Sequence, residues 1–282
     1  MTPFIVDLIK VNEMSDICYV EPYAGGAGSA INLLLGNHVD KIIINDANPC
    51  IYSFWCAVVE ENERFVDRIK NIRITLDEWK NQKNVMQNKK ASFDLGFATF
   101  FLSRTNRSGI LNAGPIGGVS QEKQASAKYK IDCRFNKDDM ISRITEIGKY
   151  KAKIRVENLD AIDFLEQICD IPNLLVYLDP PYFKQGKSLY MDYYRESDHQ
   201  FLADYLDKSS FHWLLSYDNV SEIQHIYRKY DLYEFNLNYT AHSVRCGKEL
   251  LTHSKNLILP QNTGIRRKAN DILLTRINNF VL

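Results

Sequence analysis

Residues 174–182 read Leu174-Leu175-Val176-Tyr177-Leu178-Asp179-Pro180-Pro181-Tyr182, and this stretch is the strongest indication of the fold in the chain. The run of apolar and aromatic residues predicts a buried strand. Asp179–Tyr182 begins where that strand ends. In doubly wound sheets, ligands bind beyond the carboxyl ends of the strands, so a carboxylate, two rigid prolines and an aromatic ring stand where chemistry is expected. A proline-rich turn that merely ends a strand is the alternative interpretation.

The N-terminal part of the chain alternates strands and helices. Ile17–Val20 is predicted as a strand, and the Gly-rich turn Ala24–Gly28 and a helix over Ser29–Leu35 follow it. A second strand, Lys41–Ile44, precedes a helix that opens at Asn48-Pro49. This order predicts an α/β fold with a Rossmann-like, doubly wound and mostly parallel sheet.

From about residue 65 to residue 150 the alternation stops. Apolar residues recur with helical spacing over Phe93–Leu102, and a loop rich in Gly and Ser runs from Thr105 to about Ala127. We therefore expect a largely helical insert at 65–150 that divides a catalytic domain into the parts 1–64 and 151–282. After the insert we expect further strands and helices: strands at 153–156, 211–216, 233–237 and 257–259, and helices at 161–168 and 220–230.

The residues that follow the predicted strand 174–178 can bind the exocyclic amine of a base. Asp179 can accept one N–H of such an amine and the Pro180 carbonyl the other, while Pro181 helps to fix the backbone. Tyr182 offers a face on which an extruded base can stack. The second signal is Glu21-Pro22-Tyr23-Ala24-Gly25-Gly26, since glycines let a ligand approach the backbone closely.

Two carboxylates complete the candidate cofactor site. Asp46, followed by Ala47, comes 21 residues after Gly25, which is the spacing of a carboxylate that binds ribose hydroxyls. Asp160, followed by Ala161, can accept from the amino group of a cofactor adenine. For both aspartates a helix cap is the alternative, and for Asp160 both roles can hold together.

These motifs, in this order and with the long insert between them, resemble the Dam-like family of DNA adenine-N6 methyltransferases. The resemblance implies that Asp46 binds the ribose of S-adenosylmethionine (SAM), that Asp179 lies at the methyl-transfer site, and that the insert is a target-recognition domain. The product of the cofactor is then S-adenosylhomocysteine, and no metal is expected. Trp213–Asp218 also resembles the next strand of the family.

Within the insert, the segment from Phe101 to Gly109 is similar to the DNA-contacting segment of the family, although Ser103 stands where the family usually has Asn. The predicted DNA-binding residues are Arg104, Asn106 and Arg107. The arginines suit phosphates or guanine edges, and a solvated loop is the alternative. The lysines at 123, 128 and 130 are either further phosphate contacts or ordinary surface.

The family usually begins with an aromatic-Gly-Gly-Lys segment that holds the methionine end of SAM. Here only Met1 and Thr2 precede Pro3–Val6, which resembles the following helix. We expect that the true start lies upstream, that SAM is bound weakly, or that the protein is inactive.

Composition limits the remaining choices. Lys plus Arg and Asp plus Glu both number 35, so any DNA-binding surface must be local. The six cysteines lack the spacing of a zinc or redox motif, and no signal peptide or membrane span is predicted, which favours a cytoplasmic protein.

The sequence thus predicts site-specific methylation of adenine N6 in double-stranded DNA, with a restriction enzyme or a defence system as a possible partner. Two alternatives remain: an amino-methyltransferase acting on RNA, cytosine N4 or a protein amide, and a non-catalytic relative that binds SAM or nucleic acid.

Overall fold

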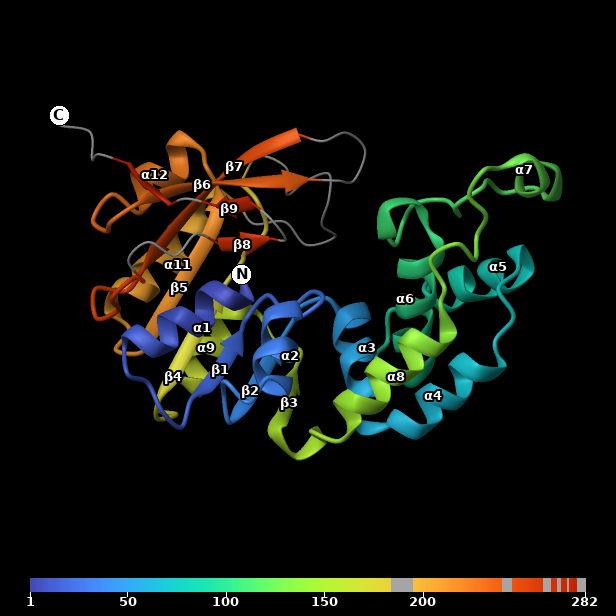
Figure 1. Cartoon of the computed structure of the whole chain (residues 1–282), viewed down its shortest axis with the longest axis horizontal. Helices are drawn as coiled ribbons and strands as arrows, with labels where there is room; N and C mark the ends of the chain where they lie inside the picture. The colour runs from blue at the N-terminus through green and yellow to red at the C-terminus, as the bar shows by residue number, and fades with distance from the viewer. Residues whose placement is uncertain (184–194, 240–244, 261–264, 268–269, 273, 278–282) are drawn as a thin grey trace. The chain divides into compact units, whose positions relative to one another are not determined.

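The computed structural model describes residues 1–183, 195–239, 245–260, 265–267, 270–272 and 274–277 (Figure 1). The chain forms two compact units. The first comprises Met1–Ala47 and Leu159–Leu282, and the second comprises Asn48–Asn158. The predicted insert, 65–150, lies within the second unit. Among the described residues, no helix is both long and apolar enough to cross a membrane.

The first unit is built on a central sheet. Its strands are β1 (Cys18–Glu21), β2 (Lys41–Asn45), β4 (Leu174–Leu178), β5 (His212–Asp218), β6 (Tyr233–Tyr239), β7 (Arg245–His253) and β10 (Thr275–Arg276). The strand order of the sheet is β10-β6-β7-β5-β4-β1-β2-β3, in which β3 is Ile154–Glu157. A separate two-stranded sheet consists of β8 (Ile265–Arg267) and β9 (Asn270–Ile272).

The centre of the sheet is parallel. β1 pairs in parallel with β2 and β4, and β4 pairs in parallel with β5, whereas β7 runs antiparallel to both β5 and β6. The strand order places β4 beside β1, although the second unit separates them in the sequence. The predicted α/β fold with a mostly parallel sheet is therefore confirmed, and the residues at the carboxyl ends of β1, β4 and β5 become neighbours.

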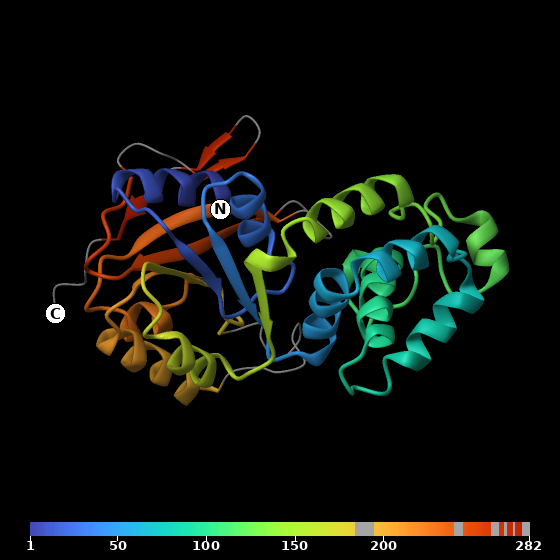
Figure 2. The ribbon, with the colours of Figure 1, turned by 90° about the horizontal axis from the view of Figure 1, so that it is seen from below.

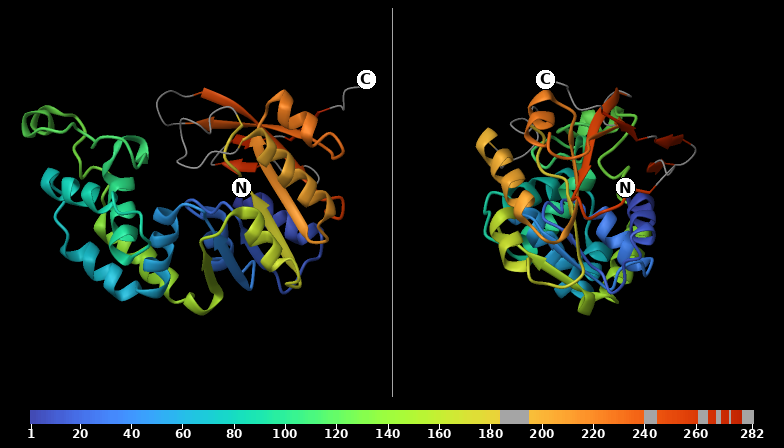
Figure 3. Two further views of the ribbon diagram at one scale, coloured as in Figure 1. Left: turned by 180° about the vertical axis from the view of Figure 1, so that it is seen from behind. Right: turned by 90° about the vertical axis from the view of Figure 1, so that its left-hand side faces the viewer.

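Helices cover both faces of this sheet. They are α1 (Thr2–Val11), α2 (Gly28–Leu35), α9 (Ala161–Ile168), α11 (Glu196–Lys208) and α12 (Ser221–Ile226). Figure 2 shows the strands between a layer that contains α1 and a layer that contains α9 and α11. In the left panel of Figure 3, which is seen from behind, the layer with α9 and α11 lies nearest the viewer.

The face against α9 and α11 holds the main apolar core. Val176 and Leu178 of β4 pack there with Phe164 of α9 and Leu202 of α11, all of them fully buried. Because side chains alternate along a strand, Tyr177 and the next odd-numbered position, Asp179, point to the opposite face. The alternation therefore separates the core-forming residues of β4 from those that reach the candidate site.

The last predicted strand is wrong. Leu257–Leu259 is not a strand, and the partner of β6 is instead β7, at Arg245–His253. The side chain of Asn12 takes the place of a neighbouring strand: its Oδ1 accepts from the N–H of Ile258, and its Nδ2 donates to the carbonyl of Ile258. β7 carries charged residues and a glycine, so the pairing with β5 and β6, rather than local propensity, makes it a strand.

The second unit is mainly helical. Its helices are α3 (Pro49–Glu60), α4 (Asn62–Asn71), α5 (Leu76–Val85), α6 (Phe93–Thr105), α7 (Gln121–Ser126) and α8 (Lys137–Gly148), with short 3₁₀ turns at Arg107–Gly109 and Lys151–Lys153. α6 is the centre, because apolar residues on all its sides are buried. A side chain at Gly96 would come within 2.2 Å of the Ser53 carbonyl oxygen, so only glycine lets α3 and α6 approach so closely.

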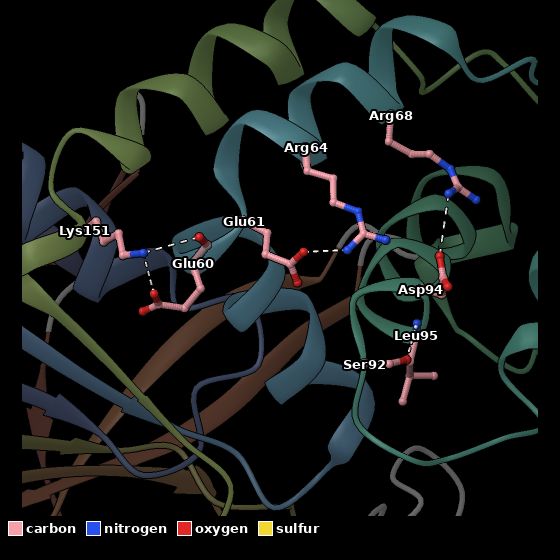
Figure 4. Close-up of polar contacts among 8 residues, drawn as sticks. All are labelled: Glu60, Glu61, Arg64, Arg68, Ser92, Asp94, Leu95 and Lys151. Atoms are coloured by element: carbon pink, nitrogen blue, oxygen red, sulfur yellow. Dashed lines mark hydrogen bonds and ion pairs between the residues drawn. The ribbon is translucent and has the colours of Figure 1, made fainter.

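Several cations on the outside of this unit have acidic partners, three of which are drawn in Figure 4. Arg64 pairs with Glu61 at 2.5 Å, and its guanidinium lies 3.7 Å from the centroid of the Phe93 ring. Arg68 pairs with Asp94 at 3.6 Å. These exposed pairs each contribute little to stability, typically below about 1 kcal/mol.

Candidate functional site

The predicted catalytic tetrapeptide lies at the carboxyl end of β4. The register pairs Leu178 with Leu215, so Asp179 follows directly beside Ser216 of β5. The hydroxyl of Ser216 donates to Oδ1 of Asp179 at 3.1 Å, and the hydroxyls of Tyr177 and Ser216 are hydrogen-bonded at 2.8 Å. Since the single proton of Ser216 goes to Asp179, Tyr177 must be the donor in the second bond. This chain of hydroxyls fixes one carboxyl oxygen of Asp179.

The carboxyl of Asp179 is harder to ionise than that of an ordinary aspartate. Burial among protein atoms, and next the charge of Glu249, raise its pKa to about 6, while the hydrogen bond from Ser216 acts in the opposite direction. The residue nevertheless retains solvent-exposed surface. Asp179 is thus surrounded by protein but still accessible from the solvent, as a residue that contacts a substrate must be.

The aromatic ring of the tetrapeptide is held by a second carboxyl. The hydroxyl of Tyr182 donates to Oε1 of Glu249 at 2.7 Å, and Glu249 is buried on β7. The backbone N–H of Phe183 donates to Oδ1 of Asp218 at 2.9 Å, which anchors the end of the tetrapeptide to β5. Pro180 is buried and Pro181 is half-buried between these two anchors.

Glu21, at the end of β1, makes its hydrogen bonds inside the protein. Its Oε1 accepts from the hydroxyl of Tyr19 at 3.1 Å and from the backbone N–H of Ala30 in α2 at 2.9 Å. Burial raises the pKa of Glu21 to about 8, although the two hydrogen bonds oppose that shift. The carboxyl is therefore largely neutral at pH 7, and it joins β1 to α2 on either side of the Gly-rich turn.

The Gly-rich turn is open on one side. Gly25 has φ +46°, and a side chain at Gly25, Gly26 or Gly28 would meet no atom within 4 Å. The N–H of Gly25 donates to Oδ2 of Asp46 at 2.9 Å. Asp46 does not cap the next helix, because the side chain of Asn48 does so by accepting from the N–H of Cys50. Asp46 and the turn thus lie together at the ends of β1 and β2, with open space at the glycines.

Asn45 connects these loops, and the sequence analysis did not identify it. It is completely buried, and its Nδ2 donates to the carbonyls of Pro22 at 2.9 Å and Leu159 at 3.1 Å. Its Oδ1 accepts from the N–H of Leu159 at 2.9 Å. A polar residue at the end of an apolar strand was the signal available in the sequence. One side chain therefore sets the spacing between the turn after β1 and the segment that leads to Asp160.

Asp160 has the capping role that was one of its two interpretations. Its Oδ1 accepts from the N–H of Ile162 at 2.9 Å, at the start of α9. The residue is exposed, whereas Ala161 beside it is buried. Pro22, Tyr23 and Ala24 lie in the turn after β1, where the N–H of Ala24 donates to the carbonyl of Asn45. Ala47 lies just beyond Asp46.

The predicted DNA-binding residues lie in the second unit, at the end of α6. Arg104 is half-buried and Arg107 is exposed. Asn106 is completely buried: its Nδ2 donates to the carbonyls of Ile110 and Leu111, and its Oδ1 accepts from the indole of Trp79 at 2.6 Å. Because both amide protons are used inside the loop, Asn106 shapes the segment that carries Arg107 and does not present a polar group at the surface.

Comparison with known proteins identifies the family. The model of the D12 class N6 adenine-specific DNA methyltransferases matches residues 1–241. No curated protein matches the chain. Among solved structures, the crystal structure of protein LPL1258 from Legionella pneumophila str. Philadelphia 1 matches 89% of this chain and 84% of its own, at 12% identity and a TM-score of 0.30, too low to support any inference about this protein.

Proposed function

The chain belongs to the D12 class N6 adenine-specific DNA methyltransferase family, and we propose from this that it transfers the methyl group of SAM to N6 of an adenine flipped out of double-stranded DNA. The observation that carries the proposal is the arrangement at the end of β4. Asp179 is fixed by Ser216 and remains accessible, and the Tyr182 ring beside it is held by Glu249.

The loops after β1 and β2 fit SAM. Open space at Gly25 and Gly26 lets a nucleoside lie against the backbone, and Asp46 stands at the end of β2, where it can accept from ribose hydroxyls. Asp160 and Ala161 start α9 and would face the adenine of the cofactor. When bound, SAM supplies a methyl group that is already activated by its sulfonium, so the protein has to position the acceptor.

The acceptor is positioned by two oxygens. The N6 lone pair of adenine is delocalised into the ring, so the free amine is a poor nucleophile. Asp179 accepts one N6–H, and the carbonyl of Pro180 accepts the other, which directs the lone pair at the methyl group. As the N–CH₃ bond forms, the S–CH₃ bond breaks and its electron pair remains on sulfur, giving S-adenosylhomocysteine. The surplus N6 proton leaves through the Asp179 carboxylate to solvent.

The second unit is proposed as the target-recognition part. Arg104 and Arg107 stand at the end of α6, and the surface lysines 123, 128 and 130 are exposed in the segment around α7. Arginine and lysine are the residues that contact DNA phosphates, and arginine also reads guanine edges. Methylation mapping of DNA from cells that express the chain would give the recognition sequence, against which a partner restriction enzyme can be sought.

A transfer assay tests the function. The chain is incubated with SAM that carries a tritiated methyl group and with double-stranded DNA, RNA or protein. We expect label in DNA, recovered as N6-methyladenine after hydrolysis, and its loss with Asp179→Ala but not with the exposed control Asp170→Ala. Label in RNA alone, or in cytosine, would contradict the proposed substrate. The absence of label from every substrate, with DNA or SAM still bound, would indicate a non-catalytic relative.

A further inference from the structure

The arginines of the second unit fall into two kinds. Arg64 and Arg68 have the acidic partners shown in Figure 4, and Arg143 on α8 pairs with Asp139 at 3.1 Å. Arg104 and Arg134 form no ion pair or side-chain hydrogen bond with any residue that the structure describes. Two neighbouring arginines without an acidic partner among the described residues, one of them half-buried, point to a ligand that would supply the negative charge.

Arg104 is in an unfavourable place for an unpaired cation. It lies in the last turn of α6 and is half-buried. Its pKa is lowered, first by burial and then by the charges of Arg134 and Arg143. The one carboxylate that opposes this shift belongs to Asp139, which already binds Arg143. Partial burial of a guanidinium beside like charges is destabilising unless an anion shares the site.

Aromatic packing brings Arg134 to this place from 30 residues further along the chain. The next residue, Phe135, is buried, and its ring centroid lies 5.6 Å from the centroid of Phe100 and 5.6 Å from that of Phe101, both on α6. The backbone just before α8 is therefore fixed against α6. Arg134 itself is exposed. Its charge acts on Arg104, so the two guanidinium groups lie in one neighbourhood.

The loop after α6 leaves room for the Arg134 guanidinium. Gly109 has φ +74°, and a side chain there would lie 3.2 Å from the carbonyl oxygen of Ser103 and 3.7 Å from Nη2 of Arg134. The guanidinium thus lies over bare backbone. The buried Asn106 amide, which donates to the carbonyls of Ile110 and Leu111, holds the backbone of this loop in place beside the guanidinium.

We propose that Arg104 and Arg134 together bind a backbone phosphate of double-stranded DNA. This rests on the proposed function and adds Arg134, from outside the segment that resembles the family's DNA contact. A phosphate fits because it matches the planar, multiply donating guanidinium and supplies the charge that the local protein lacks. The contact is independent of base sequence, and it positions the second unit on DNA rather than reading the target.

The test is binding of fluorescent duplex DNA at several salt concentrations, by fluorescence anisotropy. The variants are Arg134→Gln, Arg104→Gln and Arg134→Lys, with Arg68→Gln as the matched control because Arg68 already pairs with Asp94. We expect Arg134→Gln to weaken binding about tenfold at low salt and to reduce the slope of log K against log salt by about 1. Arg134→Lys should keep the slope, and Arg68→Gln should change neither quantity.

Two further measurements distinguish a phosphate contact from a purely structural role of Arg134. Without DNA, the unfolding temperature of Arg134→Gln should equal or slightly exceed that of the unsubstituted chain, because a repulsion is removed. If the role of Arg134 were purely structural, the substitution would lower the unfolding temperature. The loss of affinity should be equal for duplexes of different sequence. Unchanged affinity and slope, a loss confined to one sequence, or binding of RNA only would each overturn the inference. If affinity and slope are unchanged, or the loss is confined to one sequence, but the unsubstituted chain still transfers methyl groups to DNA, then the proposed function holds and only the phosphate contact is refuted.

Discussion

The hydroxyl of Tyr182 donates a hydrogen bond to the buried carboxyl of Glu249, with 2.7 Å between the two oxygens. Glu249 belongs to β7, an antiparallel strand 67 residues after the tetrapeptide. The same carboxyl is the charge that, after burial, raises the pKa of Asp179. Glu249 therefore acts on both polar side chains of the tetrapeptide: it orients Tyr182 by a hydrogen bond and makes Asp179 harder to ionise.

The first prediction concerns the ring of Tyr182. Removing the ring in Tyr182→Ala should reduce methyl transfer about 10- to 100-fold, because stacking of a base on an aromatic ring is worth roughly 1–3 kcal/mol. Tyr182→Phe keeps the ring and loses only the bond to Glu249, so its loss should be smaller. Steady-state transfer rates over a range of DNA concentrations measure both. Equal losses for the two variants would mean that the hydroxyl, not the ring, matters.

The second prediction concerns pH. The surplus N6 proton can leave through Asp179 only when the carboxyl is ionised. Because the pKa of Asp179 is about 6, the transfer rate should fall as the pH drops through about 6. The charged and titratable groups around it are Glu21, Tyr177 and Glu249. Removing the negative charge in Glu249→Gln lowers the pKa of Asp179, so the acid limb of the rate profile should move to lower pH.

Single-turnover rates with enzyme in excess would measure that profile, with DNA binding followed separately at each pH. A change in overall rate without movement of the acid limb would show that Glu249 acts on Tyr182 alone. The control is Glu166→Gln on α9, an exposed carboxyl, which should leave the limb where it is.

The third prediction concerns stability. The folded state raises the pKa of Glu21 from 4.5 to about 8, so this group favours folding below pH 4.5, and that contribution is lost as the pH rises through 8. Glu21→Gln keeps the acceptor oxygen for Tyr19 and Ala30 but cannot ionise. The unfolding free energy of the unsubstituted chain should therefore decline relative to the variant, by up to about 1.4 kcal/mol per pH unit between those values. Urea unfolding at pH 5, 6.5 and 8 measures the difference; a constant difference would contradict the assignment.

The fourth prediction concerns Asn45. Asn45→Ala leaves the N–H of Leu159 and the carbonyl of Pro22 buried without the bonds that Asn45 provides, at a cost of about 1–3 kcal/mol for each group. We expect lower stability and weaker SAM binding in calorimetry, because both the turn after β1 and the start of α9 lose their common support. Asn71→Ala, which removes an exposed contact to the Asp67 carbonyl, is the control and should have little effect on either quantity.

The local motifs could be predicted because each depends on residues that are close together in the sequence. The buried strand 174–178, the turn after β1 and Asp46 follow one another in the sequence as they do in space, and periodicity and spacing detect such patterns. Asp160 was read in the same way, and its bond to Ile162 confirms the helix cap. The bonds of Asn106 were hidden, since Trp79 lies 27 residues before it.

The amino-acid sequence by itself determined the parallel α/β class and placed Asp179–Tyr182 at a strand end, because alternation of apolar runs and turns is a local property of the chain. Only the tertiary structure decided that Glu249 holds Tyr182, that Asn45 joins the turn after β1 to the segment before α9, and that Phe135 carries Arg134 to Arg104. Each of these depends on side chains far apart along the chain, and strand pairing and core packing, not local propensity, bring them into contact.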